Sequence, residues 1–286
     1  MQRTPELARK FYDRFEPIHA LTYFAPEVRE ALDNLGYRGF WMGYFAARSA
    51  PLGAVPAQVV TAVFYNFAQA RVAKALPSAW DIAGPDVALR ARQDSAVAAL
   101  RRCGLDDDEN VCTAAELAVR AAQQTPVDGR ALFAANVALP VPPDPLAALW
   151  HATTLLREHR GDTHVAVLVA EGISGRESNV LHTTASGLPP DYMKRARHYD
   201  DAEWSACEQR LADRGLIDDK GSLTPAGRDF KDHIETTTDQ LALRAFDGLD
   251  DDELQALFNA LTPVARMVIA GGDLPATTPM SVRLDF

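Results

Sequence analysis

The sequence has few cysteines and no long apolar run. Its three cysteines, Cys103, Cys112 and Cys207, form no C-x-x-C pair, and their irregular spacing excludes a disulfide framework. No window approaches the roughly 18 consecutive apolar residues of a membrane span, and the first residues lack the apolar centre of a signal peptide. These absences predict a cytoplasmic protein with reduced thiols and no membrane partner.

Several catalytic signatures are also absent. The chain has no G-x-G-x-x-G, P-loop, G-x-S-x-G or zinc-ligand spacing. Nucleotide cofactors and serine-type hydrolysis are therefore disfavoured. The cofactor, if there is one, stays unknown, and so does whether any reaction is catalysed.

Positive charge is scarce. The chain carries 39 acidic against 29 basic residues, a net charge of −10. Proteins gain most of their non-specific affinity for DNA when positively charged side chains neutralise phosphates, and this chain has no net positive charge. Any DNA binding must rest on a local basic surface.

What is abundant is apolar spacing typical of helices, which predicts a mostly α protein. The expected helices cover residues 5–16, 26–48, 56–75, 85–103, 113–123, 129–136, 145–160, 163–171, 174–186, 190–198, 200–214, 225–245 and 250–270. We expect a helical unit at 1–105, a second, repeat-like unit at 113–162, a winged helix at 163–246, and a C-terminal helix and tail at 247–286.

The repeat is suggested by two proline-rich breaks, "FAARSAPLGAVP" (45–56) and "FAANVALPVP" (133–142). An offset of 86 residues aligns their Val-Pro pairs, and it also aligns Tyr65 with His151 and Arg71 with Arg157. Two related helical units predict a pocket where they meet.

The segment from 163 to 246 carries a recognisable pattern. Ser174 and Glu177 form a capping box, and "RGLIDDKGSLTPAG" (214–227) predicts two short strands around a turn, followed by a helix from Pro225. This stretch resembles the winged-helix domain of MarR-type regulators, which implies a small two-stranded β-wing. The whole chain is similar to bacterial proteins of about this length identified only as helix-turn-helix proteins.

In such regulators the helix before the wing reads the DNA major groove. Here that helix, 200–214, begins with Asp200, Asp201 and Glu203, which would repel phosphate. We therefore interpret its DNA-reading surface as degenerate. Under the alternative, a MarR-type ligand-responsive regulator, a displaced basic cluster would touch DNA. The residues of that alternative are Lys194, Arg195, Arg197, Arg210 and Arg214.

Aromatic and polar side chains on the two repeat helices are typical of a small-molecule pocket. The predicted ligand-binding residues are Tyr65, Asn66, Arg71, Trp150, His151, Arg157, Glu158 and His159. Arg71 and Arg157 would hold a carboxylate, and His151 or His159 would carry a proton, oriented by Glu158. Plain core packing of the aromatics remains open.

The histidine-rich stretch "WHATTLLREHRGDTH" (150–164) has further interpretations. It does not have the H-E-x-x-H spacing, so no metal site is predicted. A metal or haem bound through His151, His159, His164 or His182 stays open. The simplest alternative is a polar helix end with a turn at Gly161-Asp162.

Two hypotheses result. The first is a helical protein that senses or transforms a small, carboxylate-bearing or aromatic ligand on a winged-helix scaffold. The second is the regulator that binds DNA as a dimer. The long helices at 225–245 and 250–270 predict a homodimer in either case.

Overall fold

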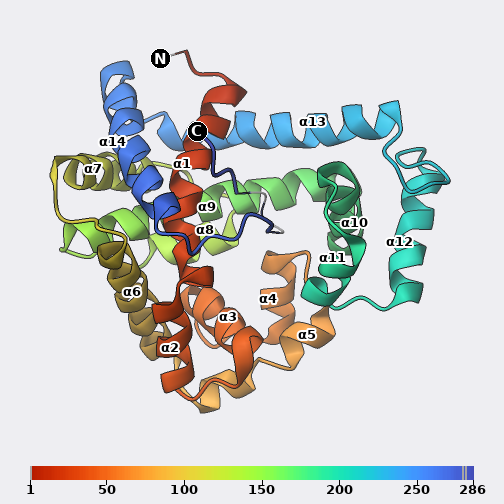
Figure 1. Ribbon diagram of the computed structural model, residues 1–286, viewed down its shortest axis with the longest axis horizontal. Coiled ribbons are helices and arrows are strands. Elements are labelled where there is room, and N and C mark those ends of the chain that lie inside the picture. Colours follow the sequence, from red (N-terminus) through yellow and green to blue (C-terminus); the bar gives the residue numbers. More distant parts are fainter. Residues whose placement is uncertain (1, 279, 281) are drawn as a thin grey trace.

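The computed structural model describes residues 2–278, 280 and 282–286, and the elements in this part of the chain are helices (Figure 1). The α-helices are α1 (Pro5–Phe24), α2 (Pro26–Asn34), α3 (Gly39–Ser49), α4 (Ala57–Phe64), α5 (Gln69–Ala73), α6 (Pro85–Arg102), α7 (Glu109–Gln123), α8 (Ala131–Val137), α9 (Pro145–Ala170), α10 (Gly175–Ser186), α11 (Pro190–Arg197), α12 (Asp201–Asp213), α13 (Pro225–Ala242) and α14 (Asp251–Ala270). Three 3₁₀ turns are η1 (Ala50–Leu52), η2 (Ser78–Asp81) and η3 (Leu243–Phe246). The prediction of a mostly α protein is confirmed.

Helix α9 runs through the middle of the molecule. It begins at Pro145 after the Asp144 cap, whose side chain accepts the N–H of Ala147. It packs against α1, α6, α7 and α8, and α13 lies along it (Figure 1).

The larger hydrophobic core is built from α1–α8, α14 and the first half of α9. Phe11 on α1 stacks on Phe246 with ring centroids 4.4 Å apart, and Phe258 of α14 meets the same ring edge-on. The N-terminal and C-terminal helices therefore share one core.

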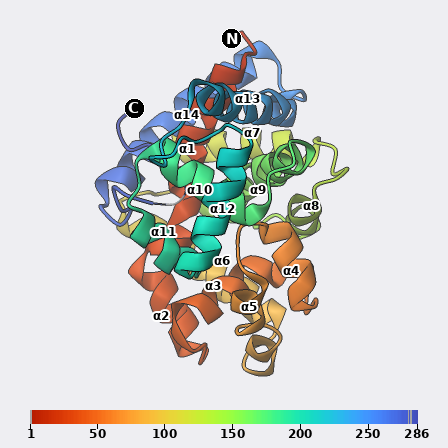
Figure 2. The same cartoon turned by 90° about the vertical axis from the view of Figure 1, so that its right-hand side faces the viewer.

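A second, separate core starts in the last turns of α9 and continues through α10–α13. Trp204, Cys207 and Leu211 form the buried face of α12. The predicted capping box of Ser174 and Glu177 is present at the start of α10. Figure 2, which faces this side, shows α12 in front, α13 above it, and α4 and α5 below.

The predicted two-stranded β-wing is wrong. In the part of the chain that the structure describes there is no strand, and between α12 and α13 only one isolated bridge joins Ile217 to Leu223. The carboxylate of Asp218 accepts the N–H groups of Lys220 and Ser222, both at 2.9 Å. A tight turn held by a side chain leaves too few residues for a ladder, so the fold is all-α.

The predicted turn at Gly161-Asp162 is also wrong, because α9 continues through both residues. Asp162 instead caps another helix: its Oδ2 accepts the N–H groups of Leu132 and Phe133 at the start of α8, each at 2.9 Å. What looked like a polar helix end is a buried capping contact.

Two predicted helices are interrupted. The segment 26–48 divides into α2 and α3, and 56–75 divides into α4 and α5 around Tyr65, whose φ is 53°. A non-glycine residue rarely adopts that conformation. The repeat aligns Tyr65 with His151, but their structural positions differ. Tyr65 ends α4, whereas His151 lies inside α9.

The two long C-terminal helices pack within the chain, α13 against α9 and α1, and α14 against α7 and α1. The homodimer stays a prediction. Among the described residues, no helix is long and apolar enough to cross a bilayer.

Candidate functional site

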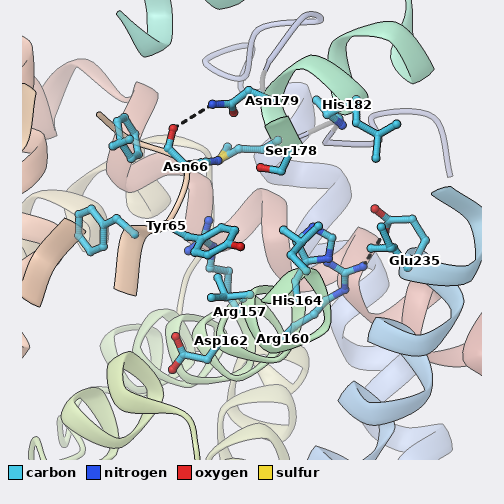
Figure 3. A pocket seen from close by; sticks show the side chains of 18 of the residues that line it. Tyr65, Asn66, Arg157, Arg160, Asp162, His164, Ser178, Asn179, His182 and Glu235 are labelled. Carbon is cyan, nitrogen blue, oxygen red and sulfur yellow. Dashed lines mark hydrogen bonds and ion pairs between the residues drawn. The ribbon is translucent and has the colours of Figure 1, made fainter. Parts of the chain in front are cut away.

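A cavity of about 470 Å³ lies between the two cores. We call it the central cavity. Its walls come from α1, α3, the end of α4, the second half of α9, and α10, α11 and α13. Figure 3 shows Arg157, Arg160 and His164 of α9 on one side and Ser178, Asn179 and His182 of α10 on the other.

Four of the predicted ligand-binding residues line the central cavity: Tyr65, Asn66, Arg157 and Glu158. The other four do not. The guanidinium of Arg71 lies over the Trp41 ring, 4.0 Å from its centroid. The remaining three, Trp150, His151 and His159, are buried in the helical packing.

These three side chains lie away from the central cavity because α9 is buried on nearly every side. Trp150 belongs to the larger core, beneath the guanidinium of Arg92. His159 packs edge-on against Phe133, with ring centroids 5.1 Å apart. Trp150 and His159 therefore pack in the interior, as the core-packing alternative expects.

Tyr65 and Asn66 join the two cores. The hydroxyl of Tyr65 donates a hydrogen bond to the carbonyl of Ile173, and the Asn179 amide donates to the carbonyl of Asn66 at 2.9 Å. The φ of 53° at Tyr65 occurs in a segment that these contacts hold to Ile173 and to Asn179 of α10.

The sequence suggested that Glu158 orients a histidine, but its carboxylate pairs with two arginines instead. Its Oε2 accepts from Arg157 Nη1 at 2.9 Å and from Arg48 Nη2 at 3.2 Å. Burial raises the pKa of Glu158, but the two guanidinium charges outweigh burial and hold it at about 2. Arg157 is therefore already engaged by a carboxylate of the protein.

A second ion-pair cluster, missed from the sequence, connects α1, α9 and α13. Arg160 Nη2 lies 2.9 Å from Asp239 Oδ1 and 3.2 Å from Glu235 Oε2. Arg9 contacts the same two carboxylates, and Lys231 pairs with Glu235. Apart from Lys231 and Glu235, which are four residues apart on α13, these partners are far apart in sequence, and no local spacing signals them.

His164 and His182 also line the central cavity. His164 Nδ1 lies 3.0 Å from the hydroxyl oxygen of Thr238, whose proton is donated to the carbonyl of Ile234. Thr238 must therefore accept from Nδ1–H, so Nε2 of His164 carries the lone pair. Burial lowers the pKa of His164 to about 3 and that of His182 to about 4, so both rings are neutral at pH 7. No cluster of three metal-ligating side chains occurs among the described residues.

The residues proposed to touch DNA are mostly engaged within the protein. Lys194 pairs with Asp201 at 2.8 Å, and Arg210 with Glu177 at 2.6 Å. Arg214 donates to the carbonyls of Glu171 and Gly172, both at 3.0 Å.

The other two residues of that set differ sharply. Arg195 is exposed, whereas Arg197, at the end of α11, is only 8% exposed and lines the central cavity. Its guanidinium lies 4.4 Å from the centroid of the Phe67 ring. Arg197 therefore faces the interior rather than a DNA duplex.

Comparisons with known proteins place the chain in a family. No curated protein and no solved structure matches it. A model described as a helix-turn-helix family matches residues 8–275, which is nearly the whole chain and includes both cores. The protein therefore belongs to this helix-turn-helix family.

Proposed function

We propose that the chain binds a small molecule in the central cavity and that the α10–α13 segment serves as one wall of that site. The observation that carries this proposal is the cavity itself. Its volume of about 470 Å³ lies within the usual range of ligand pockets, and aromatic and polar side chains line it together. Binding is common to a sensor and an enzyme, and both remain within the proposal.

Gly161 supports the proposal. It lies in the interior of α9, where glycine costs about 1 kcal/mol relative to alanine. A Cβ there would lie 3.5 Å from Glu158 Oε2 and 3.8 Å from Arg157 Nη1, which are ordinary contacts. Protein packing does not require glycine at this point, and the space it leaves belongs to the central cavity.

Two fluorescent probes test the proposal: 8-anilinonaphthalene-1-sulfonate, which is an aromatic anion, and N-phenyl-1-naphthylamine, its neutral analogue. We expect both to bind the parent protein and Gly161→Leu to weaken both at least tenfold, because the new side chain fills the cavity. Ala166→Leu places the same leucine side chain on the exposed side of α9 and should change neither. Unaltered binding of both probes to Gly161→Leu would show that the central cavity is not the site.

The family match favours a second candidate, a DNA-binding regulator. Against it, the buried face of α12 is apolar, the exposed positions Asp201, Ser205 and Gln209 carry no positive charge, and the exposed Arg210 already pairs with Glu177. Retention on sheared genomic DNA at roughly 50 mM salt, where phosphate contacts are strongest, tests this candidate. We expect no retention; retention that Arg195→Glu abolishes would favour the regulator.

A further inference from the structure

We propose that Arg197 is the anchor for an acidic group, so that the ligand of the central cavity is a small aromatic or apolar molecule carrying one carboxylate or phosphate. This inference rests on the proposed function and specifies its ligand class. It reassigns an arginine that the sequence placed at a DNA interface.

The other cations of the central cavity already have counter-ions. Arg48 and Arg157 share the carboxylate of Glu158. The three remaining cations, Arg9, Arg160 and Lys231, all pair with Glu235. Each of these five cations therefore contacts a carboxylate of the protein.

Arg197 differs from all of them. Among the described residues no carboxylate forms an ion pair with its guanidinium, and its buried Nε has no hydrogen-bond partner. An unpaired charge removed from water is strongly unfavourable. A ligand anion that enters the cavity would supply the missing partner, and two N–H groups of a guanidinium can hold a carboxylate or phosphate side by side.

The position of Arg197 is fixed independently of any ligand. Its guanidinium stacks over Phe67, and its backbone carbonyl accepts a hydrogen bond from Arg176 Nη1 at 2.9 Å. A stacked guanidinium keeps the donors on its edge free. Little ordering is then needed when an anion binds, because the anchor is already in place.

The cavity wall beside Arg197 indicates the rest of the ligand. Phe64, Tyr65 and Phe67 line the cavity together with Tyr44. Such rings suit an aromatic or apolar body. On α9, the unprotonated Nε2 of His164 can accept a hydrogen bond from a hydroxyl or amine of the ligand.

The decisive experiment measures both naphthalene probes on Arg197→Gln and on Arg195→Gln, an exposed residue of the same helix. We expect Arg197→Gln to weaken the sulfonate at least tenfold and the neutral amine less than twofold, with Arg195→Gln changing neither. Equal weakening of both probes, or of neither, would overturn the anchor. If the neutral amine still responds to Gly161→Leu, the cavity proposal stands even when the anchor proposal fails.

Competition identifies the acid. Displacement of the neutral amine by 1-naphthoate in the parent protein, lost in Arg197→Gln, would assign a carboxylate. The same result with 1-naphthyl phosphate alone would assign a phosphate. Displacement by neither acid would overturn the proposal.

Stability offers a readout without any probe. Because Arg197→Gln removes an unpaired buried charge, we expect it to raise the melting temperature of the ligand-free protein. A lower melting temperature would show that Arg197 stabilises the fold and would contradict the anchor role. Arg197→Lys keeps the charge but lacks the planar guanidinium with its parallel N–H donors. We expect it to bind the sulfonate more tightly than Arg197→Gln does.

Discussion

The backbone carbonyl oxygen of Tyr65 lies 1.9 Å from the point where a Cβ on Gly175 would be placed. Real atoms do not approach so closely, so only glycine allows α10 to begin against the Tyr65 backbone. We therefore expect Gly175→Ala to push the two cores apart locally and to lower the free energy of unfolding by about 1–3 kcal/mol, as overpacking does.

Urea denaturation at neutral pH measures this loss. Ser186→Ala, at the other end of α10, is the matched control, because its side chain is exposed. The control should stay within about 0.5 kcal/mol of the parent. An unchanged midpoint for Gly175→Ala would mean that the junction at Tyr65 can shift without cost.

The carboxylate of Glu158 compensates two buried guanidiniums at once. Glu158→Gln would leave Arg48 and Arg157 without their shared counter-ion, and breaking a buried pair in this way costs about 3–5 kcal/mol. The exposed pair of Arg29 and Asp33 provides the comparison, since its atoms also lie in contact, at 2.6 Å. Asp33→Asn should cost less than about 1 kcal/mol by the same denaturation assay. Similar costs for both variants would contradict the compensating role of Glu158.

Histidine burial predicts acid sensitivity. Five buried or half-buried histidines have a pKa below the ordinary 6.5, chiefly because burial disfavours the charged ring; they are His19, His151, His159, His164 and His182. Below about pH 6.5 the unfolded chain binds protons that the folded chain does not, so the free energy of unfolding falls as pH falls. Each ring contributes up to about 1.4 kcal/mol per pH unit.

Asp162 acts in the opposite direction, because burial raises its pKa to about 6 and the folded chain then binds the extra proton. Burial also raises the pKa of Asp13 and Glu16. Three carboxyl groups then oppose five imidazoles, so we expect a net fall of the melting temperature between pH 7 and pH 5. Calorimetry across that interval measures it. A melting temperature that rises on acidification would contradict the burial of these rings.

A substitution of His159 tests one of these five histidines separately. Neither ring nitrogen has a hydrogen-bond partner, and its pKa is lowered to about 3 by burial. His159→Phe keeps the edge-on contact with Phe133 and removes two unsatisfied polar atoms. We expect equal or higher stability at pH 7, a shallower loss towards pH 5, and unchanged binding of both naphthalene probes. Weakened probe binding would restore His159 to the ligand site.

Much of the fold could be predicted from local pattern, and the errors have physical causes. The bounds of α6 and α10 agree with expectation because proline and a capping box mark their starts. The turn at Gly161-Asp162 was wrong because Asp162 caps α8, a long-range contact that local spacing cannot show. The β-wing was wrong because one side chain, Asp218, closes the turn that a ladder would have used.

The site was predicted in part. Tyr65, Asn66, Arg157 and Glu158 lie on the central cavity, but the ion-pair partners Arg48 and Glu16 of the last two come from α3 and α1. Arg197 could not be recognised, because a basic cluster on a short helix is more typical of a solvated surface. Only the packing of α11 against Phe67 shows that one of its arginines is buried.

Gly161 connects stability with binding. Gly161→Ala removes a flexible residue from the interior of α9 and adds a methyl group only in ordinary contact with Glu158, so the free energy of unfolding should rise by about 0.5–1 kcal/mol. The same methyl group enters the central cavity and should weaken both probes by a few-fold. Gly43, in the interior of α3, is the control: a Cβ there would lie 3.2 Å from two atoms of Leu32, so the gain in helix propensity should be cancelled by crowding. Greater stability together with unchanged probe binding in Gly161→Ala would mean that this glycine is not kept for a ligand.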